Sequence, residues 1–136
     1  MGGQREKGAR TVVAREPVLM VPEPGEIYWV NSETAGRRPA VVVSRSQFNR
    51  GDYCVCILCT SQRLDERNRL ASCVPFNAGE FGLPKACVLQ GETITFVEIL
   101  DIDFDAGIIG RVGSERFRDI IRAVGYVIGA ECEPTV

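Results

Sequence analysis

Two neighbouring apolar segments joined by a short polar turn constrain the fold of this chain most strongly. The first, Ala40–Ser44, contains three consecutive valines, and the second, Tyr53–Cys59, is a seven-residue apolar run. β-Branched residues favour strands, and the segment Phe48–Asp52 between the two has the composition of a turn. The sequence therefore predicts an antiparallel β-hairpin.

A register for this hairpin follows if its turn is centred near Asn49. Ser44 then lies opposite Cys54, and Arg38 lies opposite Thr60. Opposed residues have Cβ atoms roughly 4.5–5.5 Å apart, so a guanidinium and a hydroxyl share one rim of the sheet. Both groups suit a phosphate, because the guanidinium has fixed donors and the hydroxyl donates and accepts. The alternative is an edge arginine bonded to carbonyls beside an ordinary threonine.

The residues of this region and their spacing resemble those of a known family. Its separately spaced motifs are Ser32-Glu33, Gly36, Arg38-Pro39-Ala40-Val41-Val42-Val43-Ser44, Phe48-Asn49 and Cys54-x-Cys56-x-x-Cys59-Thr60-Ser61-Gln62. Flanking segments extend the similarity: Gly25–Val30, Gly82–Lys85 and Ile109–Ser114. Together they resemble the MazF/PemK family of toxin endoribonucleases over about 100 residues, the size of one domain.

The remaining segments predict strands first and the main helix last. We expect strands at Glu26–Val30, Ser72–Phe76, Ala86–Thr95 and Ile108–Val112, with a bulge at Gly91 and an exposed loop or short helix at Arg63–Ala71. Ser114 is expected to cap a helix that ends at Gly129 and carries an apolar stripe of Phe117, Ile120, Ile121, Val124 and Ile128.

This order predicts an α+β domain. We expect a small, strongly bent antiparallel β-sheet with the C-terminal helix laid against it, an SH3-like barrel; the resemblance implies the same MazF/CcdB type of fold. Residues 1–24 are expected to form a flexible or partly ordered N-terminal tail, residues 25–130 the toxin-like domain and residues 131–136 a C-terminal tail.

Six cysteines and no histidine narrow the possible chemistry. A strand directs Cys54 and Cys56 to one face and Cys59 to the other, so no metal site is expected and the thiols are interpreted as small buried hydrophobic groups. No histidine-based nucleophile or acid–base pair is available. The N-terminus lacks a secretory core and no apolar run is long enough for a membrane helix, so we expect a cytoplasmic protein with no membrane partner.

The charge distribution is asymmetric although the net charge is only −2. The segment Ala35–Leu70 contains seven arginines and three acidic residues, whereas the segment Gln90–Gly110 contains five acidic residues and no cation. An arginine-rich half can follow a short phosphate backbone while the acidic half faces elsewhere; a solvated surface of mixed charge is the alternative.

The resemblance implies a function. Family members cleave single-stranded RNA without metal or cofactor, at short specific sequences, by attack of the RNA's own 2′-OH, leaving a cyclic phosphate and a 5′-OH. The catalytic pair is expected at Arg38 and Thr60. We expect RNA contacts from Glu33, Arg37, Ser61, Gln62 and Lys85. The resemblance also implies a toxin of a toxin–antitoxin system that forms a homodimer and binds a cognate antitoxin.

Two departures keep other functions open. The loop before Ser32 is shorter than usual for the family, and the family's Gln-Ile-Arg-Thr element appears as Glu92-Thr93-Ile94-Thr95. A non-catalytic RNA- or antitoxin-binding relative of the same fold is therefore one alternative. A CcdB-like gyrase poison is another, but those toxins use a tryptophan near the C-terminus, whereas the single tryptophan here is Trp29, which we expect in the core.

Overall fold

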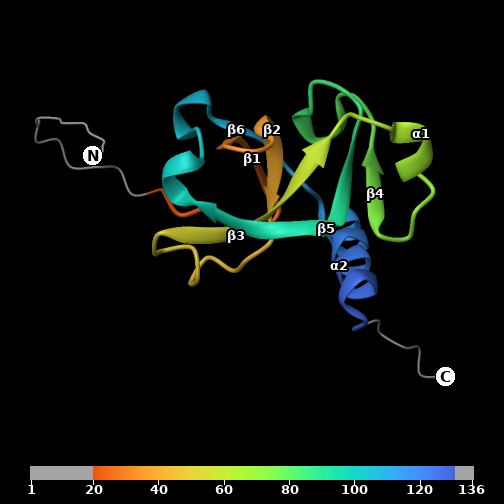
Figure 1. The fold of residues 1–136 in the computed structure, drawn as a ribbon. Helices are drawn as coiled ribbons and strands as arrows, with labels where there is room; N and C mark the ends of the chain where they lie inside the picture. Colours follow the sequence, from red (N-terminus) through yellow and green to blue (C-terminus); the bar gives the residue numbers. More distant parts are fainter. Residues whose placement is uncertain (1–19, 131–136) are drawn as a thin grey trace, which may run out of the picture.

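The computed structural model describes residues 20–130, shown in colour in Figure 1. The expected tail 1–24 falls largely outside the described residues, and the expected tail 131–136 does so entirely. The described chain forms the strands β1 (Glu26–Ser32), β2 (Gly36–Val42), β3 (Tyr53–Thr60), β4 (Cys73–Phe76), β5 (Cys87–Glu98) and β6 (Ile108–Arg111). Its helices are α1 (Leu64–Arg67) and α2 (Ser114–Ile128), with 3₁₀ turns η1 (Glu80–Gly82), η2 (Ile99–Asp101) and η3 (Phe104–Ala106).

The strands form one antiparallel sheet in the order β4-β5-β3-β2-β1-β6. Figure 1 shows the sheet curling, with α2 lying beside β5 and β4. The predicted α+β fold, a strongly bent antiparallel sheet with a C-terminal helix, is confirmed. In the described residues, no helix has the length and apolar character that crossing a membrane requires.

The predicted register of the central hairpin is confirmed over a shorter stretch than expected. Ala40 pairs with Leu58, Val41 with Ile57 and Val42 with Cys56, as a turn near Asn49 requires. The ladder between β2 and β3 consists of these three pairs. Within the described residues it includes neither the predicted Arg38–Thr60 pair nor the predicted Ser44–Cys54 pair. At the turn end, the Ser44 hydroxyl instead accepts a hydrogen bond from the Val55 amide at 2.8 Å.

Both faces of the central strands are buried, which explains their continuous apolar sequences. The main core lies under α2 and η1 and includes Ile27, Val41, Ile57, Leu89 and Ile120. The second core lies on the opposite face and includes Tyr28, Val42, Cys54, Cys56 and Ile102. Alternation along β3 therefore sends Cys54 and Cys56 to the second core and Cys59 to the main core, as predicted.

The predicted irregularity at Gly91 is present. The pairing of β5 with β3 shifts between Ile57 and Cys59, so that β5 carries extra residues where Gly91 lies. A Cβ atom at Gly91 would lie 2.9 Å from the Ala123 carbonyl oxygen of α2. The bulge therefore lets the helix approach the sheet where no side chain fits.

Two expectations for side chains were wrong. Gly113, not Ser114, is the N-cap residue of α2, and no side chain caps this helix. Trp29 is only partly buried. Its ring packs against the guanidinium of Arg37 and not against the main core. Of the predicted helix stripe, Ile120 is buried, but Ile121 and Ile128 are 51% and 65% exposed. The helix therefore presents a second apolar flank outward.

Candidate active site

A cavity of about 410 Å³ lies where β1, β2, β3 and the start of β5 approach one another. Five of the seven predicted site residues line it: Arg37, Arg38, Ser61, Gln62 and Lys85. Positions 37 and 61, far apart in sequence, are brought together because β2 and β3 are antiparallel neighbours. The three cations in its wall make the cavity suitable for a phosphate group.

Arg38 is held in place by the backbone of its own hairpin. It lies on β2 opposite Val30 of β1, is partly buried, and donates from Nε to the Ala35 carbonyl oxygen at 2.7 Å. This bond fixes the plane of the guanidinium. The two Nη groups make no hydrogen bond within the described residues, and a guanidinium of this orientation can bind two oxygens of one phosphate through them.

Thr60 ends β3 and is only 7% exposed. Its side-chain oxygen accepts from the Gln62 amide at 3.2 Å and from Arg67 Nη1 at 3.5 Å. The acceptor positions of this hydroxyl are therefore occupied, and its own proton remains available to a ligand. Thr60 itself is absent from the cavity wall, but Cys59 and Ser61 on either side of it line the cavity.

Arg67 contacts the motif threonine Thr60, a contact that sequence reasoning missed. It ends the four-residue helix α1 and donates to the Gln62 carbonyl oxygen at 2.8 Å as well as to Thr60. Arg67 thus binds the first and the last residue of the Thr60-Ser61-Gln62 motif. The arginine-rich stretch from Ala35 to Leu70 was the only signal for it in the sequence.

Arg37 is engaged by two neighbours. Its guanidinium carbon lies 4.9 Å from the centre of the Trp29 ring, and Nη1 donates to Asp103 at 2.8 Å. This charged hydrogen bond is the main reason that the pKa of Asp103 is lowered from its usual value. A phosphate group that approaches Arg37 therefore competes with a carboxylate for the same donors.

The structure does not bring Glu33 into this cavity. Glu33 is exposed in the turn between β1 and β2, at one side of the Ser32–Gly36 pair that closes the turn. Lys85, predicted by charge alone, does line the cavity. No cluster of three or more potential metal-ligating residues occurs among residues 20–130.

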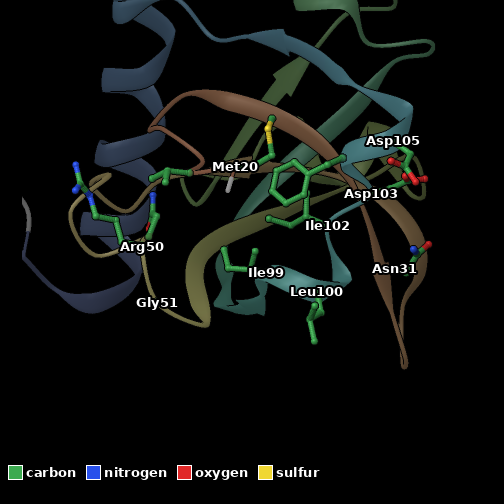
Figure 2. Close-up of a pocket in the computed structure, with 12 residues that line it drawn as sticks. Met20, Asn31, Arg50, Gly51, Ile99, Leu100, Ile102, Asp103 and Asp105 are labelled. Carbon is green, nitrogen blue, oxygen red and sulfur yellow. The ribbon is translucent and has the colours of Figure 1, made fainter. Parts of the chain in front are cut away.

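A second hollow of about 770 Å³ lies elsewhere on the molecule (Figure 2). Asp103 and Asp105 lie together at one end, Arg50 lies at the other, and Met20 and Ile102 lie between them (Figure 2). We refer to it as the acidic hollow. Although it is the larger of the two, its carboxylates repel phosphate, so the smaller cationic cavity is the candidate active site.

Fold and site together define an α+β fold with a cationic pocket at the end of a bent sheet. The family model described as "PemK-like, MazF-like toxin of type II toxin-antitoxin system" matches residues 23–128. The chain therefore belongs to the PemK-like, MazF-like family of type II toxins.

Curated relatives and solved structures agree with this assignment. The "Endoribonuclease toxin MazF" of Escherichia coli (strain K12) is 43% identical over 49 residues, a match that covers 31% of this chain and 44% of that protein. The chain thus matches less than half the length of this relative. A solved mycobacterial endoribonuclease in complex with its cognate antitoxin has a TM-score of 0.65 at 18% identity, covering 82% of this chain and 99% of that one. The MazE–MazF structure (Form-II) from Deinococcus radiodurans has a TM-score of 0.63 at 18% identity, covering 81% and 97%. These structures share the fold.

Proposed function

We propose that this protein is the toxin of a toxin–antitoxin system and acts as a metal-independent, sequence-specific endoribonuclease on single-stranded RNA. One observation carries the proposal: Arg37, Arg38 and Lys85 line a single cavity whose wall includes both residues next to the motif threonine Thr60. Membership of the toxin family supports the same activity.

The proposed reaction uses the nucleophile that RNA carries. The 2′-OH gives up its proton to water as its oxygen attacks the adjacent phosphorus, the bond to the 5′-oxygen breaks and that oxygen takes a proton, so the products are a 2′,3′-cyclic phosphate and a 5′-OH. The protein therefore has to position the strand and stabilise the charge that develops on the phosphate oxygens. No covalent intermediate with the protein is required.

Arg38 and Thr60 divide these tasks. The Nη groups of Arg38, which make no hydrogen bond within residues 20–130, bind two phosphate oxygens and deliver a proton to the leaving 5′-oxygen, since a guanidinium has donors and no acceptor. The Thr60 hydroxyl, whose oxygen already accepts from Gln62 and Arg67, donates its proton to a non-bridging oxygen. Ser61, Gln62 and Lys85 contact the flanking nucleotides.

The proposal is tested by incubating a long unstructured RNA with the protein in EDTA and mapping the ends. The wild type is compared with Arg38→Ala, Thr60→Ala and the control Arg118→Ala, an exposed arginine of α2 outside the cavity. We expect cuts at a short recurrent motif with 5′-OH ends, lost in the two site variants and kept in the control. Cleavage that persists in both site variants would refute the assignment of this pair.

The segment Glu92–Thr95 favours a second candidate, a relative that binds RNA without cutting it. It lies in β5, where the family's Gln-Ile-Arg-Thr element is expected, and supplies no cation. Glu92 is exposed and accepts a hydrogen bond from Gln90 at 3.1 Å. RNA that is retained by the folded wild type but stays intact in EDTA would favour this alternative over the nuclease.

We also propose that the protein forms a homodimer through an apolar face. A hollow of about 420 Å³ between β3, β5 and α2 is lined by exposed hydrophobic side chains, namely Phe48, Ile94, Ile121 and Ile128. Contiguous apolar surfaces of this kind are uncommon on monomers. We expect Ile121→Arg to lower the molar mass measured by light scattering from dimer to monomer, with Arg122→Ala as the control beside it; a wild-type monomer at micromolar concentration would contradict the proposal.

We propose that a cognate antitoxin with an acidic segment inhibits the toxin by occupying the cationic cavity. The solved mycobacterial relative was captured with its cognate antitoxin, and the Deinococcus radiodurans relative as a MazE–MazF complex. Charge complementarity supports the same mode here, because the cavity wall carries Arg37, Arg38 and Lys85. We place both proteins in the cytoplasm, where their RNA target and reduced thiols are found.

A further inference from the structure

Trp29 is an aromatic residue in the wall of the cationic cavity that the proposed reaction does not use. It lies on β1, lines the cavity and packs into neither of the two cores. It is also the only tryptophan in the sequence. An aromatic ring that faces a cavity instead of a core has apolar surface available to a ligand.

Strand pairing determines where the Trp29 ring lies. Trp29 is opposite Pro39 in the ladder between β1 and β2, and Arg37 is opposite Asn31, two residues further along β1. Trp29 and Arg37 therefore project from the same face of the sheet, and the guanidinium carbon lies 4.9 Å from the centre of the ring. The Trp29 carbonyl oxygen also accepts a hydrogen bond from the Asp103 amide at 2.9 Å. A paired strand thus presents the ring to the cavity.

The charge beside the Trp29 ring is largely balanced. Nη1 of Arg37 donates to Oδ2 of Asp103 at 2.8 Å, and Oδ1 of the same carboxylate accepts from the Ala106 amide at 3.1 Å. By contrast, the Nη groups of Arg38 have no hydrogen-bond partner within residues 20–130. Phosphate is therefore favoured at Arg38, whereas the surroundings of Trp29 suit a neutral, flat group.

The size and lining of the cavity agree with this division. Its volume is about 410 Å³, and pockets from about 300 Å³ upward take small ligands. Two prolines contribute apolar wall: Pro39, which is opposite Trp29, and Pro84, which precedes Lys85. A wall that combines apolar and cationic residues matches a nucleotide, which has a neutral base and a charged phosphate.

We propose that Trp29 forms a stacking site for a nucleobase of single-stranded RNA, that of the nucleotide next to the phosphate bound by Arg38. Every base has a π-face, so stacking on an aromatic ring holds the strand in place and selects only weakly among bases. The inference rests on the proposed RNA substrate, but it does not require that the RNA is cut.

The alternative is a structural role, in which the ring only packs against Arg37 and supports the end of the hairpin between β1 and β2. The two roles differ in what they predict for ligands. Stacking contributes only to the binding of ligands that carry bases. Loss of a structural contact affects every ligand of the cavity alike.

The test uses the fluorescence of Trp29, which reports on this one site because the chain has no other tryptophan. The full chain is titrated with 2′-O-methyl oligonucleotides of adenylate and of uridylate, and with an oligonucleotide of equal length and charge that lacks bases. The proposed reaction cannot cut these ligands, because their 2′-oxygens are blocked. The anisotropy of a label on each oligonucleotide measures binding independently.

We expect both base-containing oligonucleotides to quench Trp29 fluorescence at saturation, and the abasic one to bind without quenching. Trp29→Ala should weaken binding of the base-containing oligonucleotides about tenfold and leave binding of the abasic one unchanged. Trp29→Phe keeps a smaller ring and should lose less. Phe96→Ala is the matched control and should bind like wild type, because Phe96 is an aromatic residue of β5 that is 74% exposed and lies outside the cavity.

Equal quenching by the abasic oligonucleotide would overturn the stacking site, and so would equal weakening of all three ligands in both Trp29 variants. A folded wild type that binds no base-containing oligonucleotide would overturn it as well. The quenching of wild type decides the question even if Trp29→Ala does not fold. Cleavage of unmodified RNA in EDTA is measured separately: if it is absent while base-dependent quenching persists, the nuclease proposal fails and the stacking site stands.

Discussion

The cationic cavity and the acidic hollow differ in what holds them together. In the cationic cavity, Arg38 is anchored by one backbone bond, from Nε to the Ala35 carbonyl oxygen, and its Nη groups make no hydrogen bond within the described residues. In the acidic hollow, the buried polar side chain Asn49 uses all its groups: Nδ2 donates to the carbonyl oxygens of Pro22 and Ser44, and Oδ1 accepts from the Ser44 hydroxyl. Hydrogen-bond donors without a protein partner are available to a ligand, whereas donors that already have partners hold parts of the fold together.

Asp103 connects the two regions, because it lines the acidic hollow and binds Arg37 of the cationic cavity. Of these two regions, size would favour the acidic hollow as the binding site. Charge and unused hydrogen-bonding capacity select the cationic cavity instead, and four substitutions test that choice.

Arg38→Lys should give the largest effect on activity. Lysine keeps the positive charge but cannot bind two phosphate oxygens in the fixed plane of a guanidinium, so we expect kcat to fall about a hundredfold, as when one transition-state donor is removed. Cleavage of a defined single-stranded RNA measures it. Arg50→Lys in the acidic hollow is the matched control and should retain full activity. Equal losses in both variants would remove the distinction between the two regions.

Asn49→Ala tests the structural role of the acidic hollow. The change leaves the buried acceptors at Pro22 and Ser44 without their donor, so we expect the free energy of unfolding to fall by about 2–3 kcal/mol. Urea denaturation measures it, and the exposed neighbour Gln47→Ala should stay within about 0.5 kcal/mol of wild type. At a temperature where the variant is folded, its kcat should match the wild type. A stable variant with impaired cleavage would instead place the acidic hollow in the reaction.

Arg67→Ala tests whether Thr60 depends on a positioning residue. Without Arg67, one acceptor site of the Thr60 hydroxyl and the Gln62 carbonyl lose their donor. We expect kcat to fall about tenfold, equivalent to about 1.4 kcal/mol of activation energy, while KM changes little. Arg69→Ala, an exposed arginine two residues on, is the control. A rise in KM at constant kcat would show that Arg67 binds RNA instead of positioning Thr60.

The sequence predicted the sheet because its strongest signals are local. Three valines and a turn around Asn49 fixed the register, and the apolar run Tyr53–Cys59 matches a strand buried on both faces. Periodicity placed Ile121 and Ile128 in the apolar stripe of the helix but could not show that both are exposed. An apolar stripe reports that a helix face avoids water, but the partner that covers it can be the same chain or another.

The site was predictable only where a motif or a neighbouring strand placed a residue. Arg38, Ser61 and Gln62 lie at strand ends that the hairpin brings together. Arg67 was missed because α1 has only four residues and begins after Arg63 in a left-handed conformation, at φ 55°, which no periodic pattern announces. The bond from Arg37 to Asp103 joins residues 66 positions apart that are not paired in any strand.

Asp103→Asn should give the smallest effect and acts where the two regions meet. The substitution releases Arg37 and removes a negative charge beside the cavity, so we expect KM for RNA to fall only about threefold, since solvent screens an exposed ion pair. Because Arg37 lowers the pKa of Asp103, the wild-type pair persists above the usual carboxylate pKa and is lost only as the pH falls below it. The difference in KM between wild type and variant should therefore be constant near neutral pH and vanish in acid. Asp105→Asn, which lines the same hollow without a bond to Arg37, is the control. An equal gain in both variants would mean that the hollow's overall charge, and not the Arg37 bond, limits RNA binding.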